Sequence, residues 1–309
     1  MDRGFDRNAF LYPDTSGMDR EYMRNIAKAN NAIDFSKHND WIRSVPENIE
    51  FARQQQWITS EYGKYDGPVL VCGSGPSLSD NIELVRQWKD AGEYLVAVDR
   101  AVKTLHENGI YPDLIVTADT QKTVRRFFED VELMGSQKIA VHLALHPDVI
   151  DVFKKSSAQL RFYFPMNTWS FLCQKMYQDY GEEIACVEPG YVVTYSAVQI
   201  AYWMGFNRIV TIGNDLCYKT TMDAFFDVLG HPEDVCEVEG KTTILGFRLA
   251  RNVFGLFPAR YKDCSFIDCS GGLDKHGWEK RELEKTMPMS ALKAGLKIEQ
   301  EKSLAEELL

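Results

Sequence analysis

A glycine-rich turn, Gly73-Ser74-Gly75-Pro76-Ser77, follows a short apolar run and precedes an amphipathic stretch. Glycine lets a backbone turn tightly and approach a phosphate, and free amide groups at a helix start favour an anion. Ser77 has a side chain suited to capping that helix. Because no lysine follows the turn and Leu78 replaces a third glycine, it matches neither a Walker A loop nor a dinucleotide fingerprint. The turn predicts a phosphate-binding loop, with a purely structural tight turn as the alternative.

Two further apolar runs also end in polar residues. Asp99 closes the run at 94–98, and Asp119 and Gln121 come shortly after the run at 114–117. At such a strand end, an acidic residue often accepts hydrogen bonds from a ribose. Asp99 also suits the N-cap of a helix starting near residue 101, and the two roles are compatible. We expect these side chains to face the same crevice as Gly75.

The apolar run at 208–212 is followed by another polar group, and a hydroxyl-bearing helix start precedes it. Hydroxyls at such a helix start can contact a donor phosphate or bond back within the helix. Several strand ends thus deliver polar groups to one place, which indicates a binding site more strongly than any single loop does. The residues that this region adds are Thr194, Ser196, Gly213, Asn214, Asp215 and Tyr218.

The elements that must position these residues are short apolar strands that alternate with amphipathic helices from residue 67 onward. Strands that are apolar throughout and separated by helices indicate a parallel sheet covered on both faces. The sequence therefore predicts an α/β fold, a Rossmann-like doubly wound and mostly parallel sheet. The expected strands are 69–72, 94–98, 114–117, 138–142, 160–164, 208–212 and 264–268, and the expected helices are 81–89, 101–108, 148–155, 168–180 and 193–204.

Three regions differ in character along the chain. Residues 1–64 are polar, with helical spacing of apolar residues at 19–33 and 46–62, and predict a helical N-terminal extension. Residues 65–277 are expected to form the Rossmann-like nucleotide-binding domain. Residues 278–309 are charged and predict a helical C-terminal tail. These helical ends favour a homo-oligomer.

Composition narrows the function classes. The chain has 309 residues, 45% of them hydrophobic, and a formal net charge of −10. A sizeable core is expected, and the acidic balance argues against a nucleic-acid coat or a membrane-surface binder. The seven cysteines are scattered without a CxxC pair, which indicates buried thiols in a reducing compartment rather than a zinc site. Without a secretory signal or a spanning apolar run, we expect a soluble, cytoplasmic protein with no membrane partner.

Four motifs, in this order, resemble the MptE-like superfamily. They read Val-Cys-Gly-Ser-Gly-Pro-Ser-Leu, Ala-Val-Asp-Arg-Ala-Val-Lys-Thr-Leu, Asn-Gly-Ile-Tyr-Pro-Asp-Leu-Ile-Val-Thr-Ala-Asp and Ile-Gly-Asn-Asp-Leu-Cys-Tyr. The superfamily contains the archaeal 6-hydroxymethylpterin diphosphokinases and the Maf glycosyltransferases of flagellin, and it is similar in layout to single-domain bacterial sialyltransferases. The resemblance covers residues 67–218. A later segment, Phe266-Ile-Asp-Cys-Ser-Gly-Gly-Leu, is similar to a Gly-Gly segment of the Maf domain.

The resemblance implies a nucleotide-dependent transferase and separates two reactions. The pterin enzymes carry paired aspartates after the third strand, which suit Mg²⁺ and an ATP polyphosphate. Here that place reads Ala118-Asp119-Thr120-Gln121, with one carboxylate, which favours the sugar transferases and their CMP-activated donors. Related sialyltransferases use a histidine base, for which His231 is the matching candidate, with a surface-loop histidine as the alternative reading. Asp119 is the second catalytic candidate.

We therefore expect a glycosyltransferase that moves a sugar from a nucleotide-activated donor, CMP-sugar-like, to an acceptor hydroxyl. No tightly bound cofactor is expected. One alternative is a diphosphokinase that transfers pyrophosphate from ATP to a pterin-like alcohol with the help of Mg²⁺. The other is a non-enzymatic nucleotide-binding module. The sequence does not distinguish a protein, a glycan, a small molecule or a nucleobase as the acceptor.

Overall fold

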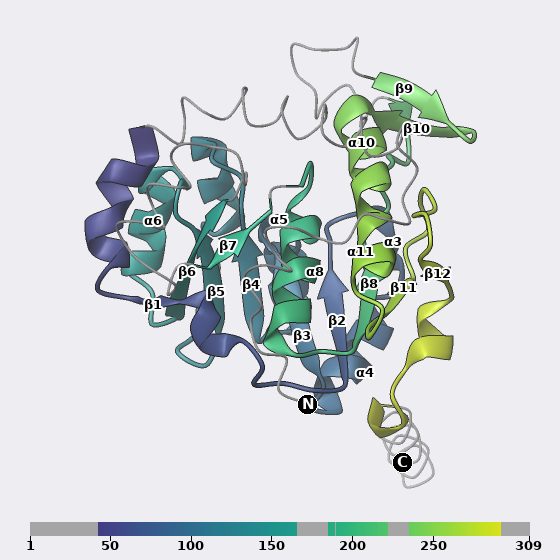
Figure 1. Cartoon of the computed structure of the whole chain (residues 1–309), viewed down its shortest axis with the longest axis horizontal. Coiled ribbons are helices and arrows are strands. Elements are labelled where there is room, and N and C mark those ends of the chain that lie inside the picture. Colours follow the sequence, from purple (N-terminus) through teal and green to yellow (C-terminus); the bar gives the residue numbers. More distant parts are fainter. Residues whose placement is uncertain (1–42, 166–184, 189, 222–234, 292–309) are drawn as a thin grey trace, which may run out of the picture.

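The computed structural model describes residues 43–165, 185–188, 190–221 and 235–291, which build one large sheet with helices on both faces (Figure 1). The sheet has ten strands in the order β1-β6-β5-β4-β3-β2-β8-β11-β12, with β7 beside β6, and every pair is parallel. The predicted Rossmann-like α/β fold is confirmed. The strands are β1 (Gln56–Trp57), β2 (Pro68–Cys72), β3 (Tyr94–Val98), β4 (Leu114–Thr117), β5 (Lys138–His142), β6 (Gln159–Pro165), β7 (Cys186–Val187), β8 (Arg208–Ile212), β11 (Ser265–Asp268) and β12 (Glu279–Lys280).

The strand order reverses between β2 and β8. From β2 the chain adds β3, β4, β5 and β6 toward one edge, and it then returns to place β8 and β11 on the other side of β2. In parallel α/β sheets, ligands bind outside the carboxyl ends of the strands at such a reversal, because the two connecting segments diverge there and leave a crevice. The topology therefore fixes where a site should be sought.

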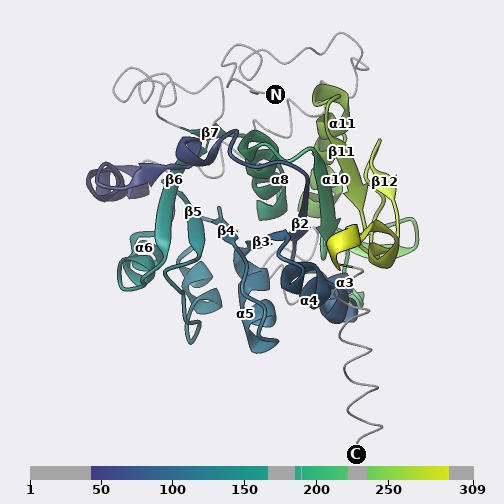
Figure 2. The same cartoon turned by 90° about the horizontal axis from the view of Figure 1, so that it is seen from below.

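Helices cover both faces of the sheet (Figure 2). One face carries α3 (Pro76–Asp80), α4 (Ile82–Asp90), α5 (Asp99–Glu107) and α6 (Pro147–Lys154). The other carries α8 (Val193–Met204), with α10 (Leu245–Phe254) and α11 (Leu256–Arg260) toward β11. Three short 3-10 helices also lie in the described part: η1 (Ile58–Glu61), η2 (Lys122–Phe127) and η5 (Leu283–Thr286).

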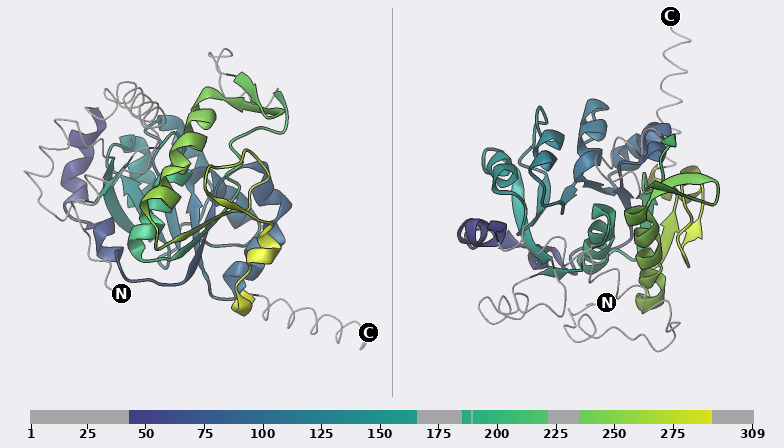
Figure 3. Two further views of the ribbon diagram at one scale, coloured as in Figure 1. Left: turned by 45° about the vertical axis from the view of Figure 1, so that its right-hand side comes forward. Right: turned by 90° about the horizontal axis from the view of Figure 1, so that it is seen from above.

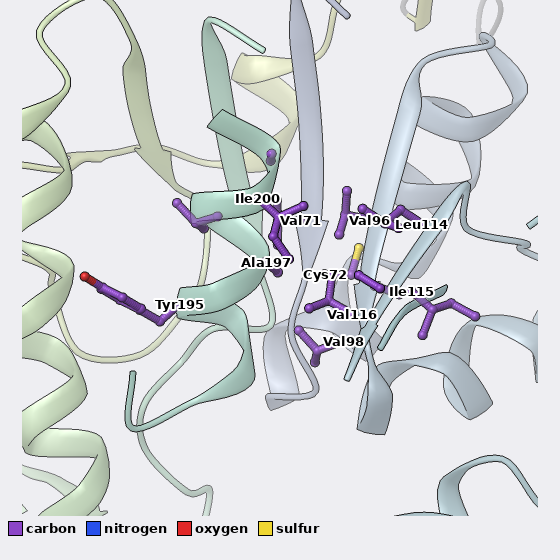
Figure 4. Close-up of a cluster of buried hydrophobic side chains, with 14 of the residues drawn as sticks. Val71, Cys72, Val96, Val98, Leu114, Ile115, Val116, Tyr195, Ala197 and Ile200 are labelled. Atoms are coloured by element: carbon purple, nitrogen blue, oxygen red, sulfur yellow. The ribbon is translucent and has the colours of Figure 1, made fainter. Parts of the chain in front are cut away.

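The buried position of α8 explains its apolar sequence. Eleven of its residues are buried, as expected of a helix that is apolar on all sides. Ala197 lies against Val71 of β2, whereas Tyr195 points to the opposite side (Figure 4), where its ring packs 4.7 Å from that of Phe257. Helix α8 thus packs on the sheet with one side and against α10 and α11 with another, and its first turn lies at the carboxyl end of the sheet.

The strands β9 (Val235–Val238) and β10 (Lys241–Ile244) form an antiparallel hairpin where the sequence suggested no element. The hairpin is attached to the loop after β8, since the Tyr218 amide donates to Thr242 O at 2.9 Å and the Thr243 hydroxyl donates to Leu216 O at 2.7 Å. It leads directly into α10 (Figure 3). The hairpin and α10 therefore extend the carboxyl-end surface beyond β8.

The predicted N-terminal extension differs from the structure in its described part. Residues 43–52 are helical, but the helix expected at 46–62 ends there, and β1 and η1 join the edge of the sheet. Glu61 anchors this segment, because it is buried and accepts hydrogen bonds from Lys138 at 3.0 Å and Arg161 at 2.9 Å. Residues 43–64 thus belong to the main core. The helices expected at 19–33 and 168–180 lie outside the described residues.

The helical tail expected from residue 278 also differs. Its first described residues form β12 and η5, and β12 pairs with β11 at the edge of the sheet opposite β1 (Figure 3). Trp278, Leu283 and Met287 are buried in the core, so hydrophobic burial decides the structure here over the charged residues between them. No helix in the described ranges has the length and apolarity of a bilayer span.

Candidate functional site

A cavity of about 530 Å³ opens at the carboxyl ends of β2, β3, β4 and β8, where the strand order reverses. We refer to it as the switch-point cavity. The first turn of α8 and the start of α10 complete its wall through Val192, Thr194 and Phe247. The structure therefore brings together polar groups that lie far apart in the sequence. The predicted site residues that line it are Ser74, Gly75, Pro76, Asp99, Asp119, Thr194, Gly213, Asn214, Asp215 and Tyr218.

The loops after β2 and β8 are bonded to each other on the floor of this cavity. The Gly75 amide donates to Gly213 O at 2.6 Å, and the Gly213 amide donates to the Ser77 hydroxyl at 3.0 Å. Ser77 in turn donates through its hydroxyl, at 2.8 Å, and its amide, at 3.2 Å, to Asp215 Oδ2. All of these groups are buried or half-buried, so the two loops act as one unit.

These bonds correct the expected role of Ser77. Helix α3 begins at Pro76 with Gly75 at its N-cap, so Ser77 lies in the first turn and does not cap it. The carboxylate of Asp215 occupies the place where a bound anion was expected. The amides of Gly75 and Ser77 are therefore not free for a phosphate, and that part of the prediction is wrong.

These loops need glycine because other segments of the protein lie too close to leave room for a Cβ atom. A Cβ at Gly75 would overlap Asp215 Oδ2 and Gly213 O, and one at Gly272 would overlap the main chain of Asp215. Gly213 also has a left-handed backbone with φ of 69°, which side-chain-bearing residues rarely adopt. The glycine turn after β2 is thus a tight structural junction and, at the same time, part of the cavity lining.

Asp99 and Asp119 bring two carboxyl groups to the β3–β4 side of the cavity. Asp99 is the first residue of α5 and only 2% exposed, and it accepts hydrogen bonds from the Arg100 amide at 2.7 Å and the Thr117 hydroxyl at 3.4 Å. Burial raises the pKa of Asp99 to about 7, the nearby charge of Asp119 adding to the increase. At neutral pH the Asp99 carboxyl is therefore about half protonated, and it can both donate and accept hydrogen bonds.

Asn214 is held by the segment that follows β11. The main-chain amide of Asn214 donates to the Ser270 hydroxyl at 2.9 Å, and its main-chain carbonyl accepts from Lys275 Nζ at 2.9 Å. Lys275 is buried and forms an ion pair of 2.7 Å with Asp268 at the end of β11. Burial raises the pKa of Asp268, but the ammonium groups of Lys275 and Lys280 outweigh this effect and hold the pKa below its ordinary value.

The β8–α10 side of the cavity is aromatic. The rings of Tyr218 and Phe247 stack at a centroid distance of 5.3 Å and an interplanar angle of 19°. Two cationic side chains also line the cavity: Arg100 beside Asp99, and Lys219, which pairs with Asp80 on the surface at 3.4 Å. The cavity thus has a carboxyl end, an aromatic end, and hydrogen-bonding groups between them.

Other predicted residues lie outside the lining. Gly73 and Ser77 lie behind it, Gln121 is exposed, and Ser196 is buried in α8, where its side chain hydrogen-bonds to Tyr163. His231 lies outside the described residues.

Sequence reasoning missed several residues that build the site. Phe247, Ser270 and Lys275 had no assigned role, and Arg100 and Lys219 were passed over. The sequence contained one indication: Cys269-Ser270-Gly271 follows the strand that ends at Asp268, in the same way as the other site loops follow their strands. The remainder depends on the hairpin, whose turn at Glu239-Gly240 has positive φ at both residues and is typical of a two-residue connection.

The described ranges contain no group of three or more His, Cys, Asp or Glu side chains arranged to hold a metal ion. Asp99 and Asp119 nevertheless both line the cavity. Mg²⁺ commonly binds to one or two protein carboxylates together with substrate phosphates. The two aspartates therefore fit a metal that arrives with a polyphosphate, although the motif after the third strand contains only the carboxylate of Asp119.

Comparison with known proteins agrees with the motifs. The family model described as 6-hydroxymethylpterin diphosphokinase MptE-like matches residues 39–221, more than half of the chain. No curated protein sequence matches significantly. Among solved structures, a Maf glycosyltransferase from Magnetospirillum magneticum AMB-1 is similar, with a TM-score of 0.57 and 21% identity over 80% of this chain. The match covers 38% of that protein, so the likeness concerns the fold of one part of it.

Proposed function

Since the chain belongs to the MptE-like family, we propose that it is a transferase that moves a sugar from a nucleotide-activated donor to an acceptor hydroxyl. The observation that carries the proposal is the switch-point cavity, where groups of four neighbouring strand ends meet. The similar solved structure is described as a Maf glycosyltransferase, which supports sugar transfer as the reaction.

The donor is proposed to lie across the strand ends. Asp99 and Asp119 would receive the nucleoside, since a buried carboxyl at the end of β3 suits ribose hydroxyls. The phosphate would lie over the loops after β2 and β8, and the sugar would reach the aromatic face of Tyr218 and Phe247. Neighbouring strands lie roughly 4.8 Å apart, so the distance from β4 to β8 is about 14 Å, enough for a nucleoside, a phosphate and a sugar in line.

The reaction needs few chemical groups from the protein. The bond between the anomeric carbon and the phosphate oxygen breaks, and its electron pair remains on the phosphate. The acceptor oxygen bonds to that carbon and loses its proton to a base. In this arrangement Asp119 lies at the nucleoside end of the donor, out of reach of the acceptor hydroxyl. His231, outside the described residues, therefore remains the candidate base. Positioning and stabilisation of the leaving phosphate would supply most of the rate enhancement.

The charges of the cavity favour a donor with one phosphate. Asp99, Asp119 and Asp215 line it together with two cations, Arg100 and Lys219. A diphosphate brings one more negative charge close to these carboxylates than a monophosphate does, and a buried charge needs a partner. We therefore favour a CMP-sugar over a UDP- or GDP-sugar when no metal is added.

The test is donor-dependent turnover. The full chain is incubated with CMP-, UDP- and GDP-sugars and, separately, with ATP and Mg²⁺, and the released nucleotides are measured by mass spectrometry. We expect release of CMP from a CMP-sugar, slow by hydrolysis and faster with a suitable acceptor. Conversion of ATP to AMP without hydrolysis of any nucleotide sugar would refute sugar transfer.

A diphosphokinase is the second candidate, because the family model carries that description and two carboxylates line the cavity. In this reaction Asp99 and Asp119 would hold Mg²⁺, which would neutralise the charge of the ATP phosphates. Formation of AMP should then require Mg²⁺ and a pterin-like alcohol, and replacement of Asp119 by Asn should abolish it. Sugar transfer from a CMP donor should continue in the presence of EDTA.

A further inference from the structure

The floor of the switch-point cavity leaves a bound phosphate with few partners. The amides of Gly73, Gly75, Ser77 and Leu78 each donate to an acceptor within the protein, and Pro76 has no amide hydrogen. The Asp215 carboxylate lies beside the same loop. A phosphate held there must therefore be bound by side chains together with the amide of Ser74, the one amide of this loop that makes no hydrogen bond among the described residues.

Asn214 supplies such a side chain. It is 3% exposed and lines the cavity, and its Nδ2 group has no hydrogen-bond partner among the described residues. A buried amide donor without an acceptor is destabilising, so a bound acceptor would remove this penalty. Because Gly213 is bonded to Gly75, the next residue, Asn214, is close to the loop after β2.

The orientation of Asn214 is set from outside the cavity. Ser270 holds the main-chain amide of Asn214, and Lys275 holds its main-chain carbonyl. Both partners are buried. Lys275 is itself fixed by Asp268, which also accepts hydrogen bonds from the Thr211 hydroxyl and the Ser270 amide. Asn214 is therefore clamped by a buried ion pair that does not line the cavity.

We propose that Lys275 is a positioning residue, which holds the Asn214 main chain so that Asn214 Nδ2 donates to the phosphate of a bound nucleotide. This inference rests on the proposed nucleotide site, but it does not depend on which group is transferred. The ligand chemistry is a phosphate monoester or diester, and Asn214 is the group that touches it. A lysine and a serine outside the cavity thereby control the affinity for phosphate.

The experiment compares nucleotides with their nucleosides. Dissociation constants of CMP and cytidine, AMP and adenosine, UMP and uridine, and GMP and guanosine are measured by titration calorimetry on the full chain. The ratio within each pair reports the contribution of the phosphate alone. In the wild-type protein we expect the preferred nucleotide to bind at least tenfold more tightly than its nucleoside, since a hydrogen bond to a charged group contributes roughly 1.5–3 kcal/mol.

Three variants test the positioning. Asn214→Asp replaces the donor with an acceptor, Lys275→Met removes the clamp, and Ser270→Ala removes the second contact without altering any charge. We expect the first two to remove most of the tenfold preference and Ser270→Ala to reduce it, while nucleoside affinity stays within about twofold. Lys262→Met is the matched control, because Lys262 is an exposed lysine that donates only to Pro258 O in the described ranges, and it should bind as the wild type does.

A purely structural role gives a different result. Lys275→Met would then lower the melting temperature and leave the ratio of nucleotide to nucleoside affinity unchanged, which would overturn the proposal. If Lys275→Met does not fold, Ser270→Ala and the conservative Lys275→Arg provide the same ratio, and an unchanged ratio in both also overturns it. A wild-type protein that prefers no nucleotide over its nucleoside would overturn it as well. Sugar transfer is judged separately by turnover, so each proposal can fail alone.

Discussion

Replacement of Asp99 by Asn should change the stability of the protein in a pH-dependent manner. Burial raises the pKa of Asp99 from 3.8 to about 7, so the folded protein binds this proton more tightly than the unfolded chain does. The contribution of Asp99 to stability is therefore greatest below about pH 4 and is lost as the pH rises to about 7. Asparagine keeps the shape of the side chain and can still accept the hydrogen bond from the Arg100 amide, but it carries no charge.

The magnitude follows from the difference between the two pKa values. Each pH unit corresponds to about 1.36 kcal/mol, so relative to low pH the shifted titration of Asp99 costs the folded state about 4 kcal/mol at pH 8, where the side chain is ionised. At pH 5, where only the unfolded chain has ionised, it costs roughly 1.5 kcal/mol. The unfolding free energy of the Asp99→Asn variant minus that of the wild type should therefore increase by about 2.5 kcal/mol from pH 5 to pH 8.

Urea unfolding followed by tryptophan fluorescence at pH 5, 6, 7 and 8 measures this difference directly. Every other titrating group contributes to the unfolding free energy of both proteins, so its contribution largely cancels in the difference between them. Asp151→Asn is the control, because in the described ranges this exposed carboxylate pairs with Lys154 alone, at 2.8 Å. The difference in unfolding free energy between this variant and the wild type should stay constant with pH. A constant difference for Asp99→Asn would refute the reasoning, since Asp99 would then be stabilised as a carboxylate.

Three other predictions concern the frame of the cavity. Gly75→Ala should destabilise the protein by about 1–3 kcal/mol in urea unfolding, because the new Cβ overlaps the carboxylate behind it; Gly246→Ala, with open space around it, should be neutral or slightly stabilising. Lys275→Met should cost about 3 kcal/mol by leaving the buried carboxylate of Asp268 with less compensation, and the double variant with Asp268→Asn should recover part of that loss; an additive loss would contradict the ion-pair argument. Phe247→Ala should weaken binding of a CMP-sugar by about 2- to 10-fold in calorimetry and leave CMP unaffected; equal weakening of both would place the ring against the nucleotide.

The central part of the fold could be predicted from sequence because its strands are short, apolar and bounded by polar loops. Four strands have the predicted bounds, at 94–98, 114–117, 138–142 and 208–212. Helix α8 also has its predicted bounds. These elements have uniform environments, so their composition alone identifies them.

The edges could not be predicted in the same way. β1 and β12 are two residues long, and such short pieces carry no periodicity. Their structure is decided by partners distant in sequence, such as the salt bridges of Glu61 with Lys138 and Arg161. The charged sequence after residue 278 suggested a solvated helix, yet three large apolar residues within it reach the core.

The site was predicted in its location but not in its bonding. Strand ends that carry Asp99, Asp119 and Asn214 meet in one cavity because parallel strands share one carboxyl edge. That Asp215 would turn back to the Ser77 amide could not be read from sequence, because this contact depends on the backbone approach of two loops 138 residues apart. The binding roles of these residues remain predictions.

The groups that fix Asn214 and Asp215 come from Ser270, Leu273 and Lys275, which lie after the region that the family model matches. Proteins with the same motifs as residues 39–221 can therefore differ in the rigidity and orientation of the loop after β8, which carries Asn214 and Asp215, if their C-terminal regions differ. Substrate preference can then diverge through residues that never touch the substrate. Shared motifs at the strand ends thus identify relatives by ancestry, while the chemistry of each one is adjusted by the part of the chain that supports the loop from behind.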